Sequence, residues 1–156
     1  MAFLDSMAIS ASALTATRLR MDIIAENMAN INTTRTESGE PYRRRYVVFQ
    51  QKERENTGSA FAQNTKESFA TYLQNAQYSG AGVRVSYIGE DQSEFKLDYN
   101  PSHPDAGEDG YVRLPNVEVV QEMVDMMSAY RAYEANITAV KTFKDMAVKT
   151  LELGKA

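Results

Sequence analysis

Two long segments with a helical spacing of apolar residues lie at opposite ends of the chain, and they constrain the fold most. All 8 methionines fall in these segments, up to Met28 and from Met123 onward. Alternating steps of three and four residues keep the apolar side chains on one helical face, as when helices share a seam. We expect these faces to be assembly interfaces, formed by Met7, Leu14, Met21, Ile24, Met28 and Ile31 near the N-terminus, and by Val119, Met123, Met126, Tyr130, Tyr133, Ile137, Val140 and Leu151 near the C-terminus.

The N-terminal segment, about residues 3–32, contains no Pro and no Gly and is rich in residues compatible with a helix. Ser10 and Thr17 occupy two positions on its apolar face, where small polar side chains permit close approach of a second helix but bury little surface. An alternative interpretation is a simple amphipathic helix that covers a core of its own domain.

Residues 116–154 are predicted to form one long helix. Pro115 precedes the segment, Asn116 is a suitable N-cap, and Gly154 is a suitable C-terminal stop. So long a helix in a chain of 156 residues cannot bury its apolar face on its own domain alone. We expect its partners to be the N-terminal helix and copies of both helices in neighbouring subunits.

The middle of the chain has the composition of a small β unit. β-branched and aromatic residues predict strands at 42–50, 83–88, 95–99 and 111–114. A variable polar stretch at 53–79 follows the first strand, and Asn64 and Glu67 have the spacing of a capping pair before a short helix. The sequence therefore predicts an α+β fold. Long N- and C-terminal helices, in residues 1–34 and 115–156, pair as a coiled coil, and residues 35–114 form a small β-rich middle domain.

Composition excludes several classes of function. The formal net charge of −4 gives no electrostatic reason to expect nucleic acid as a partner. No stretch approaches the roughly 18 uninterrupted apolar residues of a membrane span, so we expect a chain that does not cross a membrane. Cysteine is absent, which excludes disulfides and thiolate metal ligands. We expect no cofactor and no metal.

Two polar features are candidates for a site. His103, the single histidine, lies between two prolines and has no second His or Cys with which to build a common zinc site, so we interpret it as part of a rigid loop. Arg43, Arg44 and Arg45 could attract phosphate or an acidic partner. Because adjacent residues of a strand point to alternate faces, we favour a solvated edge or salt bridges to a neighbouring subunit. No catalytic constellation emerges.

Long blocks of sequence resemble one family. They lie at 27–36, 39–45, 99–106, 110–123 and 129–146, in the expected order. The chain resembles the flagellar axial proteins, the family of rod and hook subunits, and in particular the rod proteins. Thr34, Arg35 and Thr36 replace the Pro-Gly-aromatic turn of the general rod signature, which favours one type of rod subunit over the others. The family motif comprises Asn27, Ala29, Asn30, Thr33, Pro101, His103, Pro104, Tyr111, Pro115, Asn116, Tyr133, Glu134, Ala135 and Asn136.

This resemblance implies a structural subunit of the bacterial flagellar basal body and not an enzyme. It implies export by the flagellar type III apparatus and helical assembly with copies of itself and other rod proteins. The product would be the proximal rod, a hollow torque-transmitting shaft outside the cytoplasmic membrane. In this family the two termini pair as a coiled coil around the export channel, and a small β-rich part faces outward.

A long helix without a partner is marginal in water, because its stability depends on packing its apolar face. We therefore expect the terminal segments to be disordered in the monomer and to become ordered when neighbouring subunits complete the seam. The alternative from another class is a coiled-coil adaptor or binding module unrelated to flagella.

Overall fold

The computed structural model describes residues 2–52 and 82–154, and it confirms the predicted α+β class. Long helices occupy both ends, and two small antiparallel sheets lie between them. In chain order the elements are α1 (Ala2–Ala29), β1 (Arg45–Gln51), β2 (Val83–Glu90), β3 (Lys96–Tyr99), β4 (Tyr111–Leu114) and α3 (Val119–Leu153). The short helix predicted after Asn64 falls outside the described residues.

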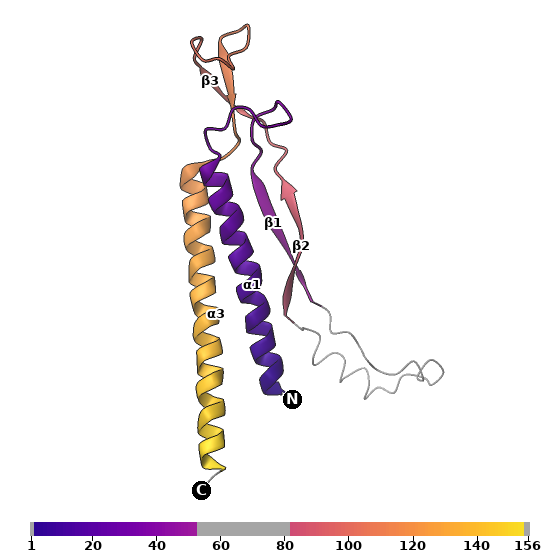
Figure 1. Ribbon diagram of the computed structural model, residues 1–156, viewed down its shortest axis with the longest axis vertical. Coiled ribbons are helices and arrows are strands. Elements are labelled where there is room, and N and C mark those ends of the chain that lie inside the picture. Colours follow the sequence, from indigo (N-terminus) through magenta and orange to yellow (C-terminus); the bar gives the residue numbers. More distant parts are fainter. Residues whose placement is uncertain (1, 53–81, 155–156) are drawn as a thin grey trace, which may run out of the picture.

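The two helices lie side by side and run in opposite directions, so that both termini of the chain are at the same end (Figure 1). Small side chains are buried on both helices: Ser10 and Ala16 on α1, and Ala129 on α3. Small residues let two helix backbones approach closely, and Ile23 and Ile24 supply the larger buried apolar surface. Ser10 is buried, and its role in the close approach of a second helix stays a prediction.

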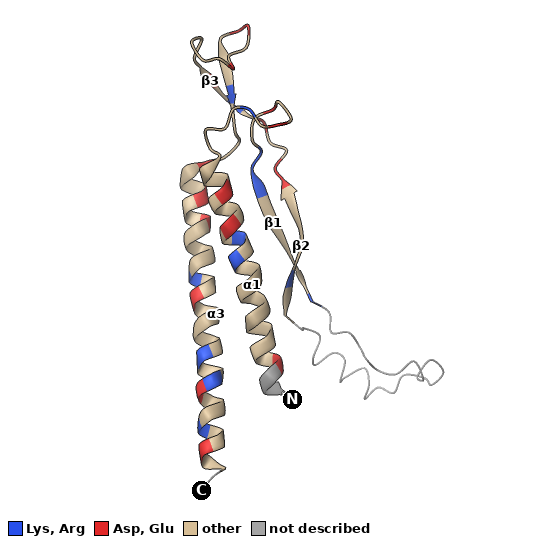
Figure 2. Ribbon diagram, in the orientation of Figure 1, with Lys and Arg blue, Asp and Glu red and all other residues tan. Residues whose placement is uncertain are grey.

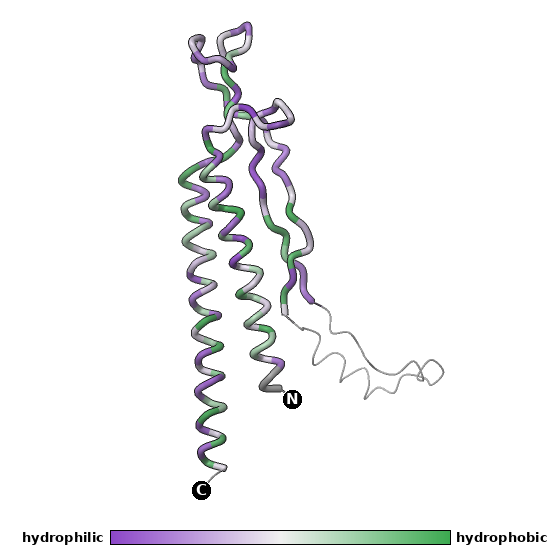
Figure 3. The backbone as a smooth tube through the Cα atoms, viewed as in Figure 1, coloured by the Kyte–Doolittle hydropathy of each residue, from purple (hydrophilic) through white to green (hydrophobic). Residues whose placement is uncertain are grey.

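Charge and hydropathy are unevenly distributed along this helix pair. Figure 2 shows acidic residues on α1 and α3 where both helices approach the start of β1, which carries basic residues. In Figure 3 apolar and polar residues alternate along both helices. The acidic residues at this end of both helices therefore lie close to the basic start of β1.

Helix ends differ from the sequence prediction in two places. The predicted N-terminal helix continued to residue 32, but α1 ends at Ala29. The chain turns after Ala29, and Thr33 N–H donates to the Asn30 carbonyl in this turn (3.0 Å). Asn116 is not the N-cap of α3: the cap residue is Glu118, which has extended backbone and makes no capping bond with its side chain. Gly154 follows the last helical residue, as predicted.

β1 and β2 form a two-stranded antiparallel ribbon that packs along α1 (Figure 1). At the start of β2, Val83 N–H donates to Ser12 Oγ on α1 (3.1 Å). Gly82, with φ +109°, approaches α1 so closely that a Cβ there would collide with Ser12. The ribbon is thereby fixed to the side of the helix.

β3 and β4 form a second hairpin at the end of the molecule opposite the two termini (Figure 1). Tyr99 and Tyr111 are directly paired, and their rings meet edge to face with centroids 5.2 Å apart. All four strands lie within three residues of their predicted positions.

Candidate functional site

A cluster of polar side chains lies where the end of α1, the start of β1 and the start of α3 meet. We call it the polar junction. It consists of Arg20, Glu26, Asn27, Tyr42, Arg44, Arg45, Asn116, Glu122 and Asp125. Among the described residues, no buried side-chain nitrogen or oxygen lacks a hydrogen-bond partner. A buried polar cluster is stabilising only when it is fully paired, and this one is.

Asn27 is the centre of the polar junction and is fully buried. Its Nδ2 donates to the carbonyl of Arg45 (2.8 Å) and to Glu122 Oε2 (3.1 Å). Its Oδ1 accepts from Tyr42 OH and from Arg45 N–H, each at 2.9 Å. Two donors and two acceptor sites are all that an asparagine side chain offers. Asn27 therefore joins α1 to β1 and α3 with no bonding capacity to spare.

Glu122 is also fully buried, and its charge is balanced by Arg44. Arg44 Nε lies 2.6 Å from Glu122 Oε1, and its Nη2 lies 3.3 Å from Asp125 Oδ2. Arg20 on α1 reaches the other oxygen of Asp125 at 3.6 Å. Buried ion pairs contribute little net stability, but they disfavour every arrangement in which one charge is left unpaired. The geometry therefore fixes the register of α1, β1 and α3.

Asn116 connects the polar junction to the loop after β2 instead of capping α3. Its Oδ1 accepts from Arg44 N–H (2.8 Å), while its Nδ2 donates to the Asp91 carbonyl (3.0 Å) and to Ser93 Oγ (2.8 Å). Bonds from the Ser93 backbone and side chain hold the pKa of Asp91 below its ordinary value. An asparagine that links three segments is not available for a helix end, which explains why the N-cap prediction was wrong.

Tyr42 closes the junction on the side of β1. Burial is the main cause that raises the pKa of Tyr42 to about 12, and the nearby carboxylate of Glu26 adds to it. The phenol is therefore protonated at neutral pH and donates to Asn27.

The three consecutive arginines have partners within this chain, whereas the sequence favoured a solvated edge or salt bridges to a neighbouring subunit. Arg44 pairs with α3 as described, and Arg45 Nη1 lies 2.8 Å from Glu26 on α1. Arg43 stacks over the ring of Phe95, 4.3 Å from its centroid. Only Arg45 belongs to β1, and each of the three side chains contacts a different segment of the same chain.

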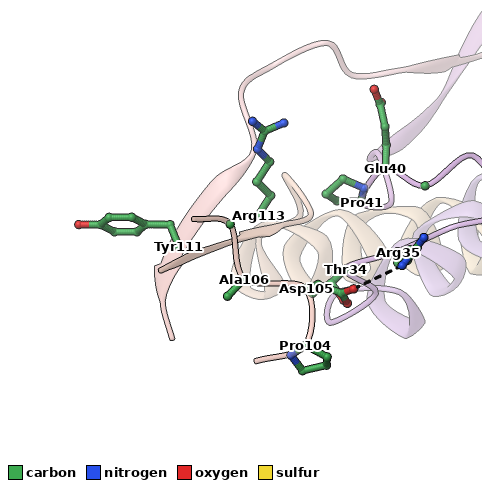
Figure 4. A pocket seen from close by; sticks show the side chains of 11 residues that line it. Thr34, Arg35, Glu40, Pro41, Pro104, Asp105, Ala106, Tyr111 and Arg113 are labelled. Carbon is green, nitrogen blue, oxygen red and sulfur yellow. Dashed lines mark hydrogen bonds and ion pairs between the residues drawn. The ribbon is translucent and has the colours of Figure 1, made fainter. Parts of the chain in front are cut away.

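A shallow hollow of about 410 Å³ lies beside the polar junction, between the segment after α1 and the loop before β4 (Figure 4). Asp105 forms one wall, where it accepts from Thr34 Oγ1 (2.8 Å) and lies 4.0 Å from Arg35. His103 Nδ1 accepts the N–H of Asp105 (3.1 Å), so the histidine orders its own loop. No group of three or more metal-ligating side chains occurs within residues 2–52 and 82–154.

The family-motif residues divide between the polar junction and the loops around it. Asn27 and Asn116 belong to the junction, and Pro115 is buried beside it. Thr33 Oγ1 donates to Asn30 Oδ1 at the end of α1. Pro101, His103, Pro104 and Tyr111 lie in or beside the β3–β4 hairpin. On α3, Tyr133 and Asn136 are half-buried, whereas Glu134 and Ala135 are exposed, as is Ala29 on α1.

The predicted assembly residues occupy two environments. Val119, Met123, Tyr130 and Leu151 are exposed. Ile24 is buried between elements of the chain, and the rest are half-buried, namely Met7, Leu14, Met21, Met28, Ile31, Met126, Tyr133, Ile137 and Val140. The face of α3 turned to α1 includes Glu122 and Ala129, which the sequence pattern did not single out. The sequence did contain a signal for Glu122: Val119 lies three residues before it and Met126 four residues after it, so its side chain falls on the apolar face of the helix.

Within the described part of the chain, no helix has the length and hydropathy to cross a bilayer.

Two family models match the ends of the chain. "Flagella basal body rod protein" matches residues 7–35, and "Flagellar basal body rod FlgEFG protein C-terminal" matches residues 108–153. The first match covers most of α1 and the second covers α3, whereas Tyr42, Arg44 and Arg45 of the polar junction lie between the two matches.

Curated relatives match the chain over nearly its full length. The flagellar basal-body rod protein FlgC of Bacillus subtilis is 47% identical over 96% of this chain and 97% of its own length. The FlgC protein of Borreliella burgdorferi is 43% identical over 94% of this chain and 93% of its own. That of an Escherichia coli strain is 40% identical over 99% of this chain and 100% of its own. The chain belongs to the FlgC family of flagellar basal-body rod proteins.

Proposed function

We propose that this chain is a structural subunit of the proximal rod of the bacterial flagellar basal body. It assembles with copies of itself and with other rod proteins into a hollow shaft that transmits torque. The near-full-length similarity to FlgC proteins from three distant bacteria is the observation that carries this proposal. Those relatives are named as rod proteins and not as enzymes, which supports a role without catalysis.

An exposed apolar stripe on α3 supports assembly through the terminal helices. Val120, Met123, Val124, Met127 and Tyr130 are all at least half-exposed on the side of α3 away from α1. Contiguous apolar surface of this kind is typical of an interaction site. Unbranched methionine side chains adapt to partners of different shape, which suits a rod in which non-identical subunits meet.

We assign two tasks to the predicted assembly residues. The half-buried members stabilise the pairing of α1 with α3, which we propose is completed as a coiled coil in the rod. Val119, Met123, Tyr130 and Leu151 contact neighbouring subunits. The helical domain, residues 1–34 and 115–156, is then the inner part around the export channel, and residues 35–114 are the outer part.

Export through the flagellar type III apparatus requires a chain that travels largely unfolded. Outside the polar junction, α1 and α3 share little large apolar surface, since their buried contacts are mostly small residues. A helix pair of this kind loses little on unfolding and gains most of its burial from neighbours. This is consistent with ordering of the terminal helices at the growing tip.

A matched pair of variants tests the proposal in a motile bacterium that depends on this gene product. Met127→Asp puts a charge on the apolar stripe, and Ser128→Asp puts the same charge on the next exposed position, off the stripe. We expect Met127→Asp to leave cells without hooks or filaments and Ser128→Asp to leave swimming intact. Normal flagella in cells that carry Met127→Asp, or in cells that lack residues 1–30, would instead favour an adaptor unrelated to flagella.

A further inference from the structure

Asp105 attaches the loop between β3 and β4 to the segment after α1. Its Oδ2 accepts from Thr34 Oγ1 (2.8 Å), and its Oδ1 lies 4.0 Å from Arg35 Nη1 (Figure 4). Among the described residues, no other hydrogen bond or ion pair joins residues 100–107 to residues 30–41. The Arg35 side chain is 73% exposed, so its ion pair contributes little. The bond from Thr34 is therefore the main polar link between the two segments.

His103 sets the position of Asp105. Its Nδ1 accepts the backbone N–H of Asp105 (3.1 Å), which requires that this nitrogen carries no proton. The same nitrogen lies 4.0 Å from Asp105 Oδ2, the oxygen that also accepts from Thr34. Both side chains of the pair are about two-thirds buried, so solvent screens their interaction only in part. The observed arrangement is that of a neutral imidazole.

Protonation of His103 reverses the bonding at Nδ1. An imidazolium donates from both ring nitrogens and accepts from neither, so the N–H of Asp105 loses its partner. The new Nδ1–H is attracted to the nearby carboxylate and can form a charge-assisted bond with Oδ2. Because Thr34 donates to this same oxygen, a move of the carboxylate toward the imidazolium weakens the Thr34 bond. The two states therefore compete for one oxygen atom.

The other charged and titratable groups around the loop leave Asp105 as the partner of the imidazolium. No carboxylate except that of Asp105 lies within ion-pair distance of His103 in the described part of the chain. Arg35 also attracts Asp105, but through the other oxygen, Oδ1. The surrounding groups, taken from the segment after α1, from the loop itself and from β4, are Arg35, Glu40, Glu108, Asp109, Tyr111 and Arg113.

The hairpin keeps its other attachments whichever charge His103 carries. Lys96 Nζ donates to the Val117 carbonyl (2.9 Å), and Arg43 stacks over the ring of Phe95. The backbone hydrogen bonds that close the turns within residues 100–111 do not involve the imidazole. Protonation therefore changes the contact of the loop with the segment after α1 and leaves the rest of the fold in place.

We propose that His103 and Asp105 form a pH-sensitive latch between the β3–β4 loop and the segment after α1. The latch is closed when His103 is neutral and Thr34 donates to Asp105. It opens when protonated His103 draws the carboxylate away from Thr34. Imidazole is the side chain that ordinarily changes charge between pH 5 and 8, so the latch responds within this range. The latch goes beyond the proposed function, because it acts within one subunit and requires no assembly.

NMR spectroscopy of the full-length chain tests the latch, because the single histidine gives one imidazole titration curve. The measured quantity is the protection factor of the Asp105 amide, which corrects hydrogen exchange for its intrinsic pH dependence. We expect this factor to fall at least fivefold from pH 8 to pH 5, with the same midpoint as the imidazole, and the Thr34 signals to follow the same curve. A constant protection factor, or a change with a different midpoint, overturns the latch.

His103→Asn is the matched control. An asparagine side chain can accept the N–H two residues further on, as Nδ1 does here, but it does not titrate. We expect this variant to keep the Asp105 amide equally protected at pH 8 and pH 5. Thr34→Val removes the bond of the closed state, so its imidazole should take up a proton at higher pH than in the unmodified chain. An unchanged midpoint in Thr34→Val, or a pH response that persists in His103→Asn, contradicts the competition for Oδ2.

Discussion

Asn27 and Glu122 are 95 residues apart in the sequence, both are fully buried, and Asn27 Nδ2 donates a hydrogen bond of 3.1 Å to Glu122 Oε2. This bond connects the last turn of α1 to the first turn of α3. Asn27 Oδ1 also accepts from the N–H of Arg45 at the start of β1, and Glu122 Oε1 accepts from Arg44 Nε just before the strand. This one pair therefore sets the positions of α1, β1 and α3. The two helices are fixed to each other at this end.

Asn27→Ala tests whether the polar junction stabilises the fold. The change removes four hydrogen bonds and leaves the Tyr42 hydroxyl and the Glu122 carboxylate short of a partner. We expect the free energy of unfolding to fall by about 3 kcal/mol, since each buried unpaired group costs roughly 1–3 kcal/mol. Urea unfolding followed by circular dichroism measures this loss. Asn32→Ala, at an exposed position, is the control, and an equal effect of the two changes would show that the junction contributes nothing special.

Arg44→Lys tests the geometry of the ion pairs. A lysine has a single ammonium group, so it cannot reproduce the separate contacts of Arg44 Nε with Glu122 and of Nη2 with Asp125. We expect a loss of about 2 kcal/mol in the free energy of unfolding. Arg43→Lys keeps a cation near Phe95 and Glu40 and is expected to cost less than about 1 kcal/mol. A reversed order of the two losses in thermal denaturation would contradict the assignment.

Alkaline pH should destabilise the protein through Tyr42. Its pKa is raised in the folded chain from 10.0 to about 12, so the fold favours the protonated phenol. The resulting stabilisation is complete below pH 10 and is lost as pH rises from 10 toward 12. Other groups titrate in the same range, so the measurement is the difference in stability between the unmodified chain and Tyr42→Phe at each pH. That difference should shrink above pH 10, and a constant difference would refute the role given to this phenol.

Gly82→Ala should detach the β1–β2 ribbon from α1. Gly82 has φ +109°. A Cβ added there would clash with the hydroxyl oxygen of Ser12 and would also lie 3.2 Å from Ser12 Cβ. Gly39 also has a positive φ, of 81°, but nothing lies within 4 Å of a Cβ there. Each change costs about 1–3 kcal/mol of backbone strain, and only Gly82→Ala adds the collision. We expect faster hydrogen exchange of β2 amides in Gly82→Ala than in Gly39→Ala, and identical rates would argue against tight docking.

Secondary structure was predictable from the sequence because it depends on local spacing and composition. The long C-terminal helix follows from steps of three and four residues and its Gly154 end, and β1 follows from the run of residues 46–49. Pairing between distant residues was not predictable in this way. Asn27 stood out only as part of a motif, and the arginines that contact it and Glu122 were expected at a solvated edge or in salt bridges to a neighbouring subunit.

Long-range geometry explains both errors at the polar junction. Asn116 is a residue type that often caps helices, and it lies just before α3. Its side-chain amide instead forms hydrogen bonds with Arg44, Asp91 and Ser93, which lie far from it in the sequence. Arg44 looks solvent-facing in the sequence, but in the structure it is half-buried, with its guanidinium group against Glu122 and Asp125 of α3. A polar residue inside an apolar helical face, as at Glu122, is the sequence signal that would have indicated a buried partner.

Hydrogen exchange followed by mass spectrometry, on the monomer and on assembled rods, tests most directly whether the terminal helices are completed by neighbours. We predict that amides of α1 before Ser10 and of α3 after Val140 exchange rapidly in the monomer, while those around Asn27 and Glu122 are partly protected. In the assembled state both helices should be protected along their full length. Slow exchange over the whole of α1 and α3 in a monomer that stays monomeric at high concentration would contradict the account.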